Sequence, residues 1–294
     1  MRRLRQLLRK GGARRAEHVV VVEGAELLSV ALAAGAEVEA VYVAPEGAEA
    51  PAVVEVTGRV LAGGGRVFDL APGVMERVAS TVTPQPLLAV VSYVPAGWDR
   101  LDGASLVVVC VDVRDPGNLG TVIRTADAAG VDAVVCCDGT VDPTNPKTVR
   151  STAGSLFHVP VVPGGTTSST LDELASRGFT TVATVVGGGT DYVAFDWTRP
   201  VALVLGNEAT GLADDVATAV ADRITIPMAG RSESLNVGVS AAVLCFEALR
   251  QRRGTASPGP APARSTMSAM QTSGPHQSGS GAVDGPVADP GAPS

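Results

Sequence analysis

The sequence predicts an α/β fold with a mostly parallel sheet, preceded by a smaller N-terminal α/β domain. Short, valine-rich apolar runs of strand length recur along the 294 residues, and segments of helical length separate them. In the second half these runs do not alternate with polar residues, which is typical of strands covered on both faces. At roughly 100–200 residues per domain, the length suggests two domains.

The first half reads as a small α/β unit. Apolar or β-branched runs predict its strands, at residues 19–22, 38–43, 66–69 and 87–94. Helices are expected at residues 24–34, ending at Gly35, and at residues 72–79. A turn-rich polar stretch then predicts a linker at residues 96–103. We therefore assign residues 1–95 to an N-terminal domain, with a basic arm at residues 1–15.

Stronger signals follow the linker and define a second domain at residues 104–253. Its expected strands are residues 106–111, 133–137, 180–186, 201–205 and 223–226. Residues 118–129 predict a helix that Gly130 closes, since Leu119 begins an apolar i, i+3, i+4, i+7 stripe and Asn118 is a good N-cap. Residues 237–250 predict a long closing helix with Asn236 as its cap.

The last segment, residues 254–294, differs from everything before it. It is rich in Gly, Pro and Ser and poor in apolar residues. Such a composition buries too little apolar surface to offset the entropy of ordering. We expect a disordered tail and assign it no function.

The net charge of −7 argues against nucleic acid, but the distribution of charge does not. The residues before Glu17 carry a basic cluster that consists of Arg2, Arg3, Arg5, Arg9, Lys10, Arg14 and Arg15. Binding to phosphates depends on the local field within about a Debye length, so an acidic protein can still bind RNA through such a cluster. A solvated, frayed arm is the other interpretation, and charge alone leaves both open.

Several classes of function find no support in the sequence. The four cysteines show no C-x-x-C spacing, and the three histidines form no metal-ligand pattern, so no metal is expected. The chain has no G-x-G-x-x-G, phosphate-loop or G-x-S-x-G motif. It shows neither a conventional signal peptide nor an apolar run of membrane-spanning length. We expect a soluble, cytoplasmic protein with free thiols and no membrane contact.

Three glycine- or polar-punctuated segments stand beside predicted strands and helices, at residues 118–126, 203–212 and 226–237. Loops at strand ends are where ligand sites form in α/β proteins. Each also has a purely structural explanation. Arg124 lies off the apolar stripe and could be a solvated arginine, residues 206–208 could be a tight turn, and Asn236 could only cap a helix.

Taken together, the three segments resemble the motifs of SpoU/TrmH-type RNA ribose 2′-O-methyltransferases of the SPOUT superfamily. The matching patterns are Asn-x-Gly-x-x-x-Arg-Thr-Ala at 118–126, Leu-Gly-x-Glu-x-x-Gly-Leu at 205–212, and Ile-Pro-Met…Ser-Leu-Asn-Val at 226–237. Asn145-Pro146-Lys147 and Ala153-Gly154 match a stretch between the first two motifs. The resemblance covers residues 104–250. Residues 19–24 and 83–91 resemble the N-terminal substrate-binding domain of that family, a ribosomal-protein-like RNA-binding fold.

The resemblance implies S-adenosylmethionine as methyl donor and a ribose 2′-hydroxyl of RNA as acceptor. It assigns the active site to Arg124, Glu208, Ser234, Asn236 and Asn118. It assigns cofactor binding to Gly206, Ile226, Leu235, Met228, Thr184, Gly187 and Asn207. We expect the basic cluster to contact RNA, together with Lys147 and Arg150. Arginine is an awkward general base because its pKa lies above ~12, so we expect Arg124 to clamp the phosphate and polarise the hydroxyl.

The resemblance also implies a C-terminal trefoil knot and a homodimer, which periodicity could not reveal. The added N-terminal domain favours ribosomal RNA, most simply 23S rRNA, as substrate. The alternatives are a tRNA ribose methyltransferase and a non-catalytic RNA-binding or ribosome-assembly factor. A nucleotide-dependent oxidoreductase is disfavoured because its fingerprint is absent. Neither the modified nucleotide nor a housekeeping or antibiotic-resistance role follows from the sequence.

Overall fold

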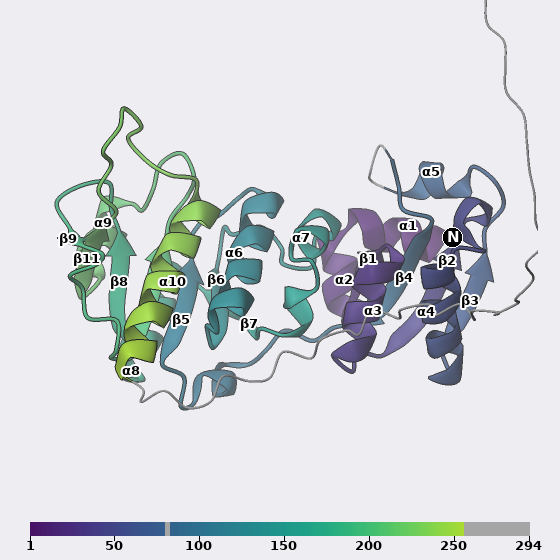
Figure 1. Ribbon diagram of the computed structural model, residues 1–294, viewed down its shortest axis with the longest axis horizontal. Helices are drawn as coiled ribbons and strands as arrows, with labels where there is room; N and C mark the ends of the chain where they lie inside the picture. The colour runs from purple at the N-terminus through teal and green to yellow at the C-terminus, as the bar shows by residue number, and fades with distance from the viewer. Residues whose placement is uncertain (80–82, 256–294) are drawn as a thin grey trace, which may run out of the picture. The chain divides into compact units, whose positions relative to one another are not determined.

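The structure, a computed structural model, describes residues 1–79 and 83–255. The predicted disordered tail therefore lies, from residue 256 on, outside the described residues. Within the described ranges the chain forms two sheets, one of four strands and one of seven (Figure 1).

The four-stranded sheet has the order β1-β4-β2-β3, from strands β1 (Val19–Glu23), β4 (Leu87–Ser92), β2 (Val38–Val43) and β3 (Arg66–Asp69). β4 runs antiparallel to both β1 and β2, whereas β2 and β3 are parallel. The predicted strands at residues 38–43 and 66–69 are confirmed to the residue. Alternate residues of the valine-rich strands face opposite sides, so each side of the sheet needs a cover.

Helices α3 (Ala25–Ala33) and α4 (Pro51–Ala62) cover one face, and α1 (Arg2–Arg9) and α5 (Val74–Val78) cover the other. Helices α4, α1 and the following α2 (Gly11–Glu17) were not predicted from the sequence. The interpretation of the first residues as a frayed arm is wrong, because α1 buries three leucines at i, i+3 and i+4, namely Leu4, Leu7 and Leu8. Their spacing was the signal, and the arginines between them obscured it.

The larger sheet is parallel throughout its described pairings, in the order β7-β6-β5-β10-β8-β11-β9. Its strands are β5 (Leu106–Cys110), β6 (Ala133–Cys137), β7 (Val161–Gly165), β8 (Thr180–Thr184), β9 (Thr190–Asp191), β10 (Val201–Leu205) and β11 (Asp222–Thr225). The mostly parallel sheet is confirmed, and β6 and β10 agree with prediction to the residue. β7 and β9 were not predicted, since both are short or glycine-containing.

Two layers of helices cover this sheet. Helices α6 (Pro116–Ala129) and α10 (Val237–Thr255) pack together on one face, with α7 (Pro146–Ser151) beside α6. Helices α8 (Thr167–Ser176) and α9 (Asp214–Ala219) cover the other face. Short 3-10 helices are found at η1 (Pro45–Gly47), η2 (Trp98–Leu101) and η3 (Ser155–Phe157). The predicted linker contains η2, whose Leu101 is buried in the core under α8.

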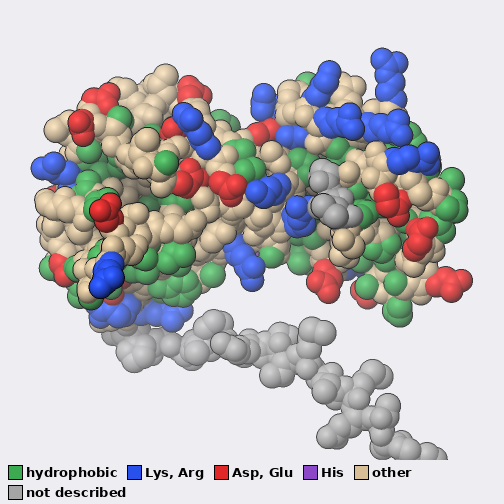
Figure 2. Space-filling model, turned by 90° about the horizontal axis from the view of Figure 1, so that it is seen from above, with side chains coloured by type: hydrophobic (Ala, Val, Ile, Leu, Met, Phe, Trp, Pro, Cys, Tyr) green, Lys and Arg blue, Asp and Glu red, His purple; other side chains and the backbone are tan. Residues whose placement is uncertain are grey.

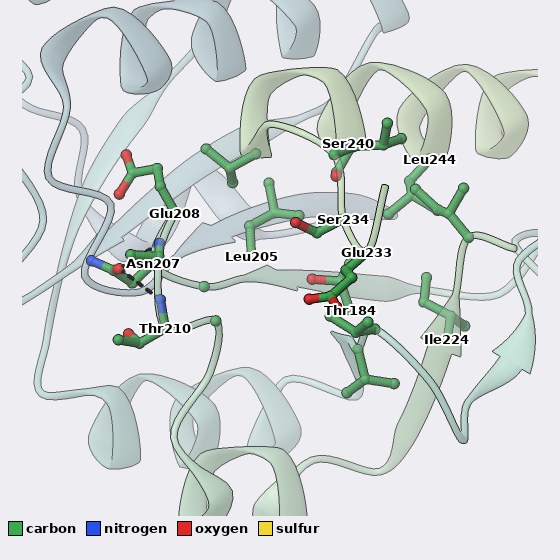
Figure 3. A pocket seen from close by; sticks show the side chains of 18 of the residues that line it. Thr184, Leu205, Asn207, Glu208, Thr210, Ile224, Glu233, Ser234, Ser240 and Leu244 are labelled. Carbon is green, nitrogen blue, oxygen red and sulfur yellow. Dashed lines mark hydrogen bonds between the residues drawn. The ribbon is translucent and has the colours of Figure 1, made fainter. Parts of the chain in front are cut away.

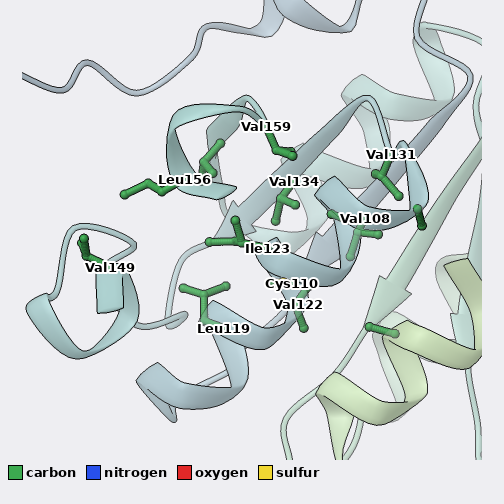
Figure 4. Close-up of a cluster of buried hydrophobic side chains, with 14 of the residues drawn as sticks. Val108, Cys110, Leu119, Val122, Ile123, Val131, Val134, Val149, Leu156 and Val159 are labelled. Carbon is green, nitrogen blue, oxygen red and sulfur yellow. The ribbon is translucent and has the colours of Figure 1, made fainter. Parts of the chain in front are cut away.

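The apolar stripe predicted for α6 faces the core. Figure 4 shows Leu119, Val122 and Ile123 directed toward Val108 and Val134 of the neighbouring strands, and all five side chains are fully buried. At about 1.5–3 kcal/mol for each fully buried aliphatic side chain, this contact is a major source of stability for the layer. It fixes α6, and therefore the residues around Asn118, against the sheet.

The predicted N-cap of this helix needs correction. Asn118 is inside α6, and Asp115 caps the helix by accepting a hydrogen bond from the backbone N–H of Asn118 at 3.0 Å. Pro116 occupies the first helical position, where its missing N–H costs nothing. The side chain of Asn118 is thereby free for contacts at the site. Asn236, by contrast, caps α10 as predicted, since its Oδ1 accepts from the N–H of Gly238 at 2.9 Å.

Candidate active site

A pocket lies at the carboxyl ends of β8, β10 and β11, where the start of α10 closes it (Figure 3). The ends of parallel strands meet at one edge of a sheet, so loops distant in sequence converge there. Leu205, Ile224 and Leu244 give the pocket an apolar floor, and Thr184, Glu233 and Ser234 contribute polar groups. An apolar cavity with a few converging polar groups is typical of a cofactor site.

Most residues assigned to cofactor binding line this pocket: Thr184, Gly206, Asn207, Ile226, Met228 and Leu235. Glu208 and Ser234 from the active-site group also line it. Gly187 does not; it is exposed in the loop after β8, and Val185 and Val186 line the wall instead. Ser240 and Leu244 also line the pocket and were not predicted, although their helical spacing from Val237 was an available signal.

Gly206 is the point of closest backbone approach in the site. A Cβ built on it would lie 2.5 Å from the carbonyl carbon of Gly211 and 2.7 Å from the backbone nitrogen of Leu212. Both neighbours are backbone atoms, so they cannot swing aside. Two hydrogen bonds of 2.9 Å between Asn207 and Gly211 hold the loop in this fold. Only glycine fits where β10 ends.

Asn207 shapes this loop from within. Its Oδ1 accepts hydrogen bonds from the N–H groups of Ala209 and Thr210, at 2.9 and 3.2 Å. Its Nδ2 donates to the carbonyl oxygen of Asp112 at 2.9 Å. Asn207 therefore lines the pocket, but its side-chain amide is engaged in holding the loop. These hydrogen bonds alone explain why an asparagine occupies position 207, without a side-chain contact to a cofactor.

Three side chains from separate motifs form a hydrogen-bonded cluster beside the pocket, which we call the rim cluster: Glu208, Asn118 and Asn236. Asn118 Nδ2 donates to Glu208 Oε1 at 3.0 Å, and Asn236 Nδ2 donates to Asn118 Oδ1 at 2.8 Å. Asn236 also caps α10, so the cluster joins the starts of α6 and α10 to the loop after β10. Asn236 can therefore cap α10 and belong to the rim cluster at the same time.

Glu208 accepts from the protein on both carboxylate oxygens. In addition to Asn118, the backbone N–H of Asp115 donates to Oε1 at 3.1 Å and that of Arg114 donates to Oε2 at 3.3 Å. Burial raises the pKa of Glu208, but the hydrogen bonds from Asn118 and these two backbone groups outweigh it and lower the pKa below its ordinary value of 4.5. Glu208 is therefore an anion that orients its neighbours.

We expect Glu208→Gln to weaken cofactor binding by roughly fivefold to tenfold, or about 1 kcal/mol. Glutamine retains one acceptor oxygen. In place of the other oxygen it has an NH₂ group, which cannot accept the hydrogen bond that a backbone N–H donates there in the wild type. Calorimetric titration with S-adenosylmethionine measures the effect, and Glu76→Gln on the exposed side of α5 serves as the matched control. Equal affinity in Glu208→Gln and wild type would mean that the rim cluster does not support the pocket.

The lowered pKa of Glu208 also predicts a pH dependence. A group whose folded pKa is depressed contributes its full stabilisation above its ordinary value and loses it as the pH falls through the depressed pKa. Because Glu208 stays ionised from about pH 5 upward, its titration should not change the cofactor affinity of the wild type there, and the affinity should fall only in more acidic solution. Titrations between pH 4 and 8 test this, and a Glu208-dependent transition near neutral pH would contradict it.

Arg124 does not join the rim cluster of its own chain. It is exposed on α6, and no hydrogen bond or ion pair links it to any residue in the described ranges. It follows Asn118 by six residues, which is roughly 9 Å along a helix axis. The structure thus brings Asn118, Glu208 and Asn236 together, places Ser234 in the pocket wall, and leaves Arg124 directed elsewhere.

The predicted RNA contacts divide into two groups. Arg14 is a correction: it is only 3% exposed, and its guanidinium donates to Thr144 Oγ1, the carbonyl oxygen of Leu7 and Asp142 Oδ2. An arginine with all its nitrogens so engaged holds α2 against the segment before α7 and cannot also bind a phosphate. The sequence could not reveal this, because Asp142 is 128 positions away.

The other basic residues remain near the surface. Four of them form ion pairs: Arg3 with Glu17 and Glu39, Arg15 with Asp142, Lys147 with Asp115, and Arg150 with Glu23. Four residues are exposed and have no ion pair within the described part of the chain: Arg2, Arg5, Arg9 and Lys10. Figure 2 shows Lys and Arg side chains gathered over part of the N-terminal domain, in the right half of the view.

Two further findings concern the described residues alone. None of their helices is both long and apolar enough to cross a membrane. Within the same ranges no group of three or more His, Cys, Asp or Glu side chains is arranged to hold a metal ion. The four cysteines are free thiols, three of them buried, and burial raises the pKa of Cys245 to about 12.

Comparison with known proteins agrees with this geometry. Residues 105–246 match the SpoU rRNA Methylase family, and residues 1–89 match the MRM3-like substrate binding domain. The 23S rRNA (guanosine(2553)-2′-O)-methyltransferase RlmP of Bacillus subtilis is 37% identical over 226 residues, covering 77% of this chain and 86% of the relative. The chain belongs to the SpoU methylase family.

Solved structures of SpoU methyltransferases share the fold over both sheets. AviRb from Streptomyces viridochromogenes, in complex with AdoMet, superimposes with a TM-score of 0.78 at 28% identity, covering 86% of this chain and 97% of that one. An AdoMet-bound rRNA methyltransferase from Sinorhizobium meliloti gives a TM-score of 0.73 at 31% identity, covering 87% and 95%. In this chain the segments at residues 118–126, 203–212 and 226–237 each supply one residue of the rim cluster.

Proposed function

We propose that this protein transfers a methyl group from S-adenosylmethionine to a ribose 2′-hydroxyl of 23S rRNA. The observation that carries the proposal is the rim cluster, in which three family motifs from distant parts of the chain meet at one pocket. RlmP, the relative from Bacillus subtilis, is named for this reaction on 23S rRNA. The substrate-binding domain matched at residues 1–89 is the second support for an rRNA substrate.

The pocket suits the cofactor. Leu205, Ile224 and Leu244 offer apolar surface to an adenine ring, and the missing side chain at Gly206 lets the ligand approach the backbone. Glu233 adds a carboxylate to the wall, where it would favour a cationic ligand. S-adenosylmethionine supplies an electrophilic methyl group on a sulfonium.

The protein's contribution to the reaction is alignment and electrostatics. Methyl transfer forms a bond between the 2′-oxygen and the methyl carbon, breaks the bond between that carbon and sulfur, and releases the hydroxyl proton to solvent. The nucleophile must lie in line with the sulfonium, which positioning alone can favour strongly. We assign Arg124 to the phosphate beside the target ribose and to polarisation of the hydroxyl. Glu208, Asn118, Asn236 and Ser234 hold the loops that set this geometry.

We further propose that the active enzyme is a homodimer joined through α6 and α10. The outer side of α10 exposes Val239 and Phe246, each 47% accessible, at the i, i+7 spacing of one helical face. Gly238 permits a close approach of α10 to α6, since a Cβ there would meet Thr121 Cγ2 at 2.7 Å. The neighbouring α6 carries Arg124, which has no partner among the described residues of its own chain. A second copy would supply that arginine to this pocket.

The trefoil knot of the resemblance belongs to the same proposal. β10 is inserted between β5 and β8, and the chain then passes through β11 before α10 returns to pack on α6. A trefoil knot additionally requires the segment before α10 to pass through an earlier loop, which is rare among folds.

Transfer of a radiolabelled methyl group to purified 23S rRNA tests the function. The product should be a nucleotide whose 3′-phosphodiester resists alkali, because a 2′-O-methyl group removes the nucleophile of hydrolysis. Radiolabel recovered on a base, or none on RNA despite bound cofactor, would exclude the proposal. The second of these results would favour the non-catalytic RNA-binding alternative.

A further inference from the structure

Two aromatic rings lie side by side at the open end of the N-terminal sheet. Tyr42 of β2 and Phe68 of β3 are in register, so both project from the face that α1 and α5 cover elsewhere. Their ring centroids are 5.3 Å apart with an interplanar angle of 20°, which is a stacked arrangement. Phe68 is 41% exposed, although apolar rings of this size are mostly buried in folded domains.

The edge position explains why the pair is open. β3 is the last strand of its sheet, so Phe68 has a neighbouring strand on one side only. Arg66, two residues earlier on the same face, places its Cζ 5.8 Å from the Phe68 ring centroid. The pair together with Arg66 forms a short ladder of planar groups that ends at the sheet edge, and a further planar ring can extend it.

The helix α1, which packs on the same face of the sheet as Tyr42, carries positive charge. Arg3 of α1 pairs with Glu17 and with Glu39 of β2, so an ion pair joins the N-terminal helix to the strand that carries Tyr42. The same helix directs Arg2, Arg5 and Arg9 into solvent. Aromatic platforms bordered by cationic side chains are the means by which proteins bind unpaired nucleic acid, because every base has a face to stack and a phosphate beside it.

We propose that Tyr42, Phe68 and Arg66 form a stacking platform for an unpaired nucleobase of the RNA substrate. The platform rests on the proposed function for its ligand class, and it deepens that function by assigning recognition of a single-stranded loop to the N-terminal sheet. The arginines of α1 would contact the flanking phosphates. A flat ring pair cannot stack on bases within a duplex, so the platform selects loops, bulges or ends.

The test uses the full-length protein and two RNA probes. One is a hairpin whose single-stranded loop carries the fluorescent base 2-aminopurine, and the other is a fully paired duplex of the same length. Phe68→Leu should weaken hairpin binding by about 5- to 100-fold, the range expected for loss of one base–aromatic stack. It should leave duplex binding unchanged, and Phe68→Trp should retain or strengthen hairpin binding. Quenching of 2-aminopurine on binding should disappear in the leucine variant.

Matched controls come from the opposite face of the same sheet. Leu61→Ala removes an apolar side chain that is 58% exposed on α4, and Arg59→Gln removes an arginine there. Neither should affect hairpin binding, whereas Arg66→Gln should weaken it and reduce its salt dependence. If Phe68→Leu binds the hairpin as tightly as wild type, or loses duplex affinity equally, the platform is refuted. A Phe68-dependent self-association with unchanged RNA affinity would refute it too, in favour of a protein partner.

The outcome is separable from that of the proposed function. Failure of the wild type to methylate 23S rRNA overturns the function, whatever the platform variants do. If the wild type methylates 23S rRNA and Phe68→Leu does so at the same rate at limiting RNA concentration, the platform alone is overturned. The expected result is a raised KM for RNA in Phe68→Leu, with kcat and the affinity for S-adenosylmethionine unchanged.

Discussion

Gly206→Ala should abolish measurable binding of S-adenosylmethionine, with an affinity loss of at least 100-fold. The added methyl group would overlap the backbone of Gly211 and Leu212, at 2.5 to 2.7 Å, where real Cβ contacts essentially do not occur. Relief requires the loop at residues 206–212 to move away from the end of β10. That loop carries Asn207, Glu208 and part of the pocket wall, so both cofactor and rim cluster lose their places.

Calorimetric titration measures this effect, and a thermal melt shows whether the variant is folded. Gly230→Ala is the matched control, because a Cβ at Gly230, in the neighbouring loop, meets nothing within 4 Å. The control should bind the cofactor like wild type. Cofactor affinity in folded Gly206→Ala within threefold of wild type would show that the pocket at this strand end is not the cofactor site.

Arg124→Ala and Arg124→Lys should lose methyl transfer by about 10²- to 10³-fold, the size typical for loss of an electrostatic group that acts in the transition state. Affinity for S-adenosylmethionine should be unchanged, since Arg124 lies outside the pocket lining. Lysine keeps the charge but not the planar fork that binds a phosphate in two places. Arg223→Ala, an exposed arginine on β11, is the control and should retain activity.

Mixing two inactive variants tests where Arg124 acts. In a dimer of one Arg124→Ala and one Gly206→Ala subunit, the first has an intact cofactor pocket and its partner has an intact Arg124. If each site takes the arginine from the other subunit, the mixture regains part of the wild-type rate, whereas neither variant alone does. Full activity of Arg124→Ala would contradict the role of Arg124 in methyl transfer. A mixture no more active than its components would contradict the supply of Arg124 by the other subunit.

Local patterns predicted the elements but not their meeting points. The strands at residues 133–137 and 201–205 were predictable because buried parallel strands are continuous apolar runs. The assignment of the N-cap to Asn118 failed for a local reason, since Asp115 precedes a proline that begins the helix earlier. The two helices before β1 were not predicted, because the seven basic residues there suggested a solvated arm and hid the helical spacing of three leucines.

The site itself could be predicted only through resemblance. Glu208 lies 90 positions from Asn118, and Asn236 lies 118 positions from it, yet hydrogen bonds of 3.0 and 2.8 Å join them. No periodicity encodes such distances, because they depend on how β10 is inserted between β5 and β8. The burial of Arg14 had the same cause. Its partners Asp142 and Thr144 belong to a distant loop, so its chemistry alone suggested a phosphate contact.

The central claim is ribose methylation of 23S rRNA, and mapping of 2′-O-methyl groups in that RNA tests it most directly. The map is compared between cells with the gene and cells without it, and between cells complemented with wild type and with Arg124→Ala. The account predicts that one 2′-O-methyl group is lost with the gene, returns with wild type and does not return with Arg124→Ala. A 23S rRNA map that is identical in all four strains would contradict it.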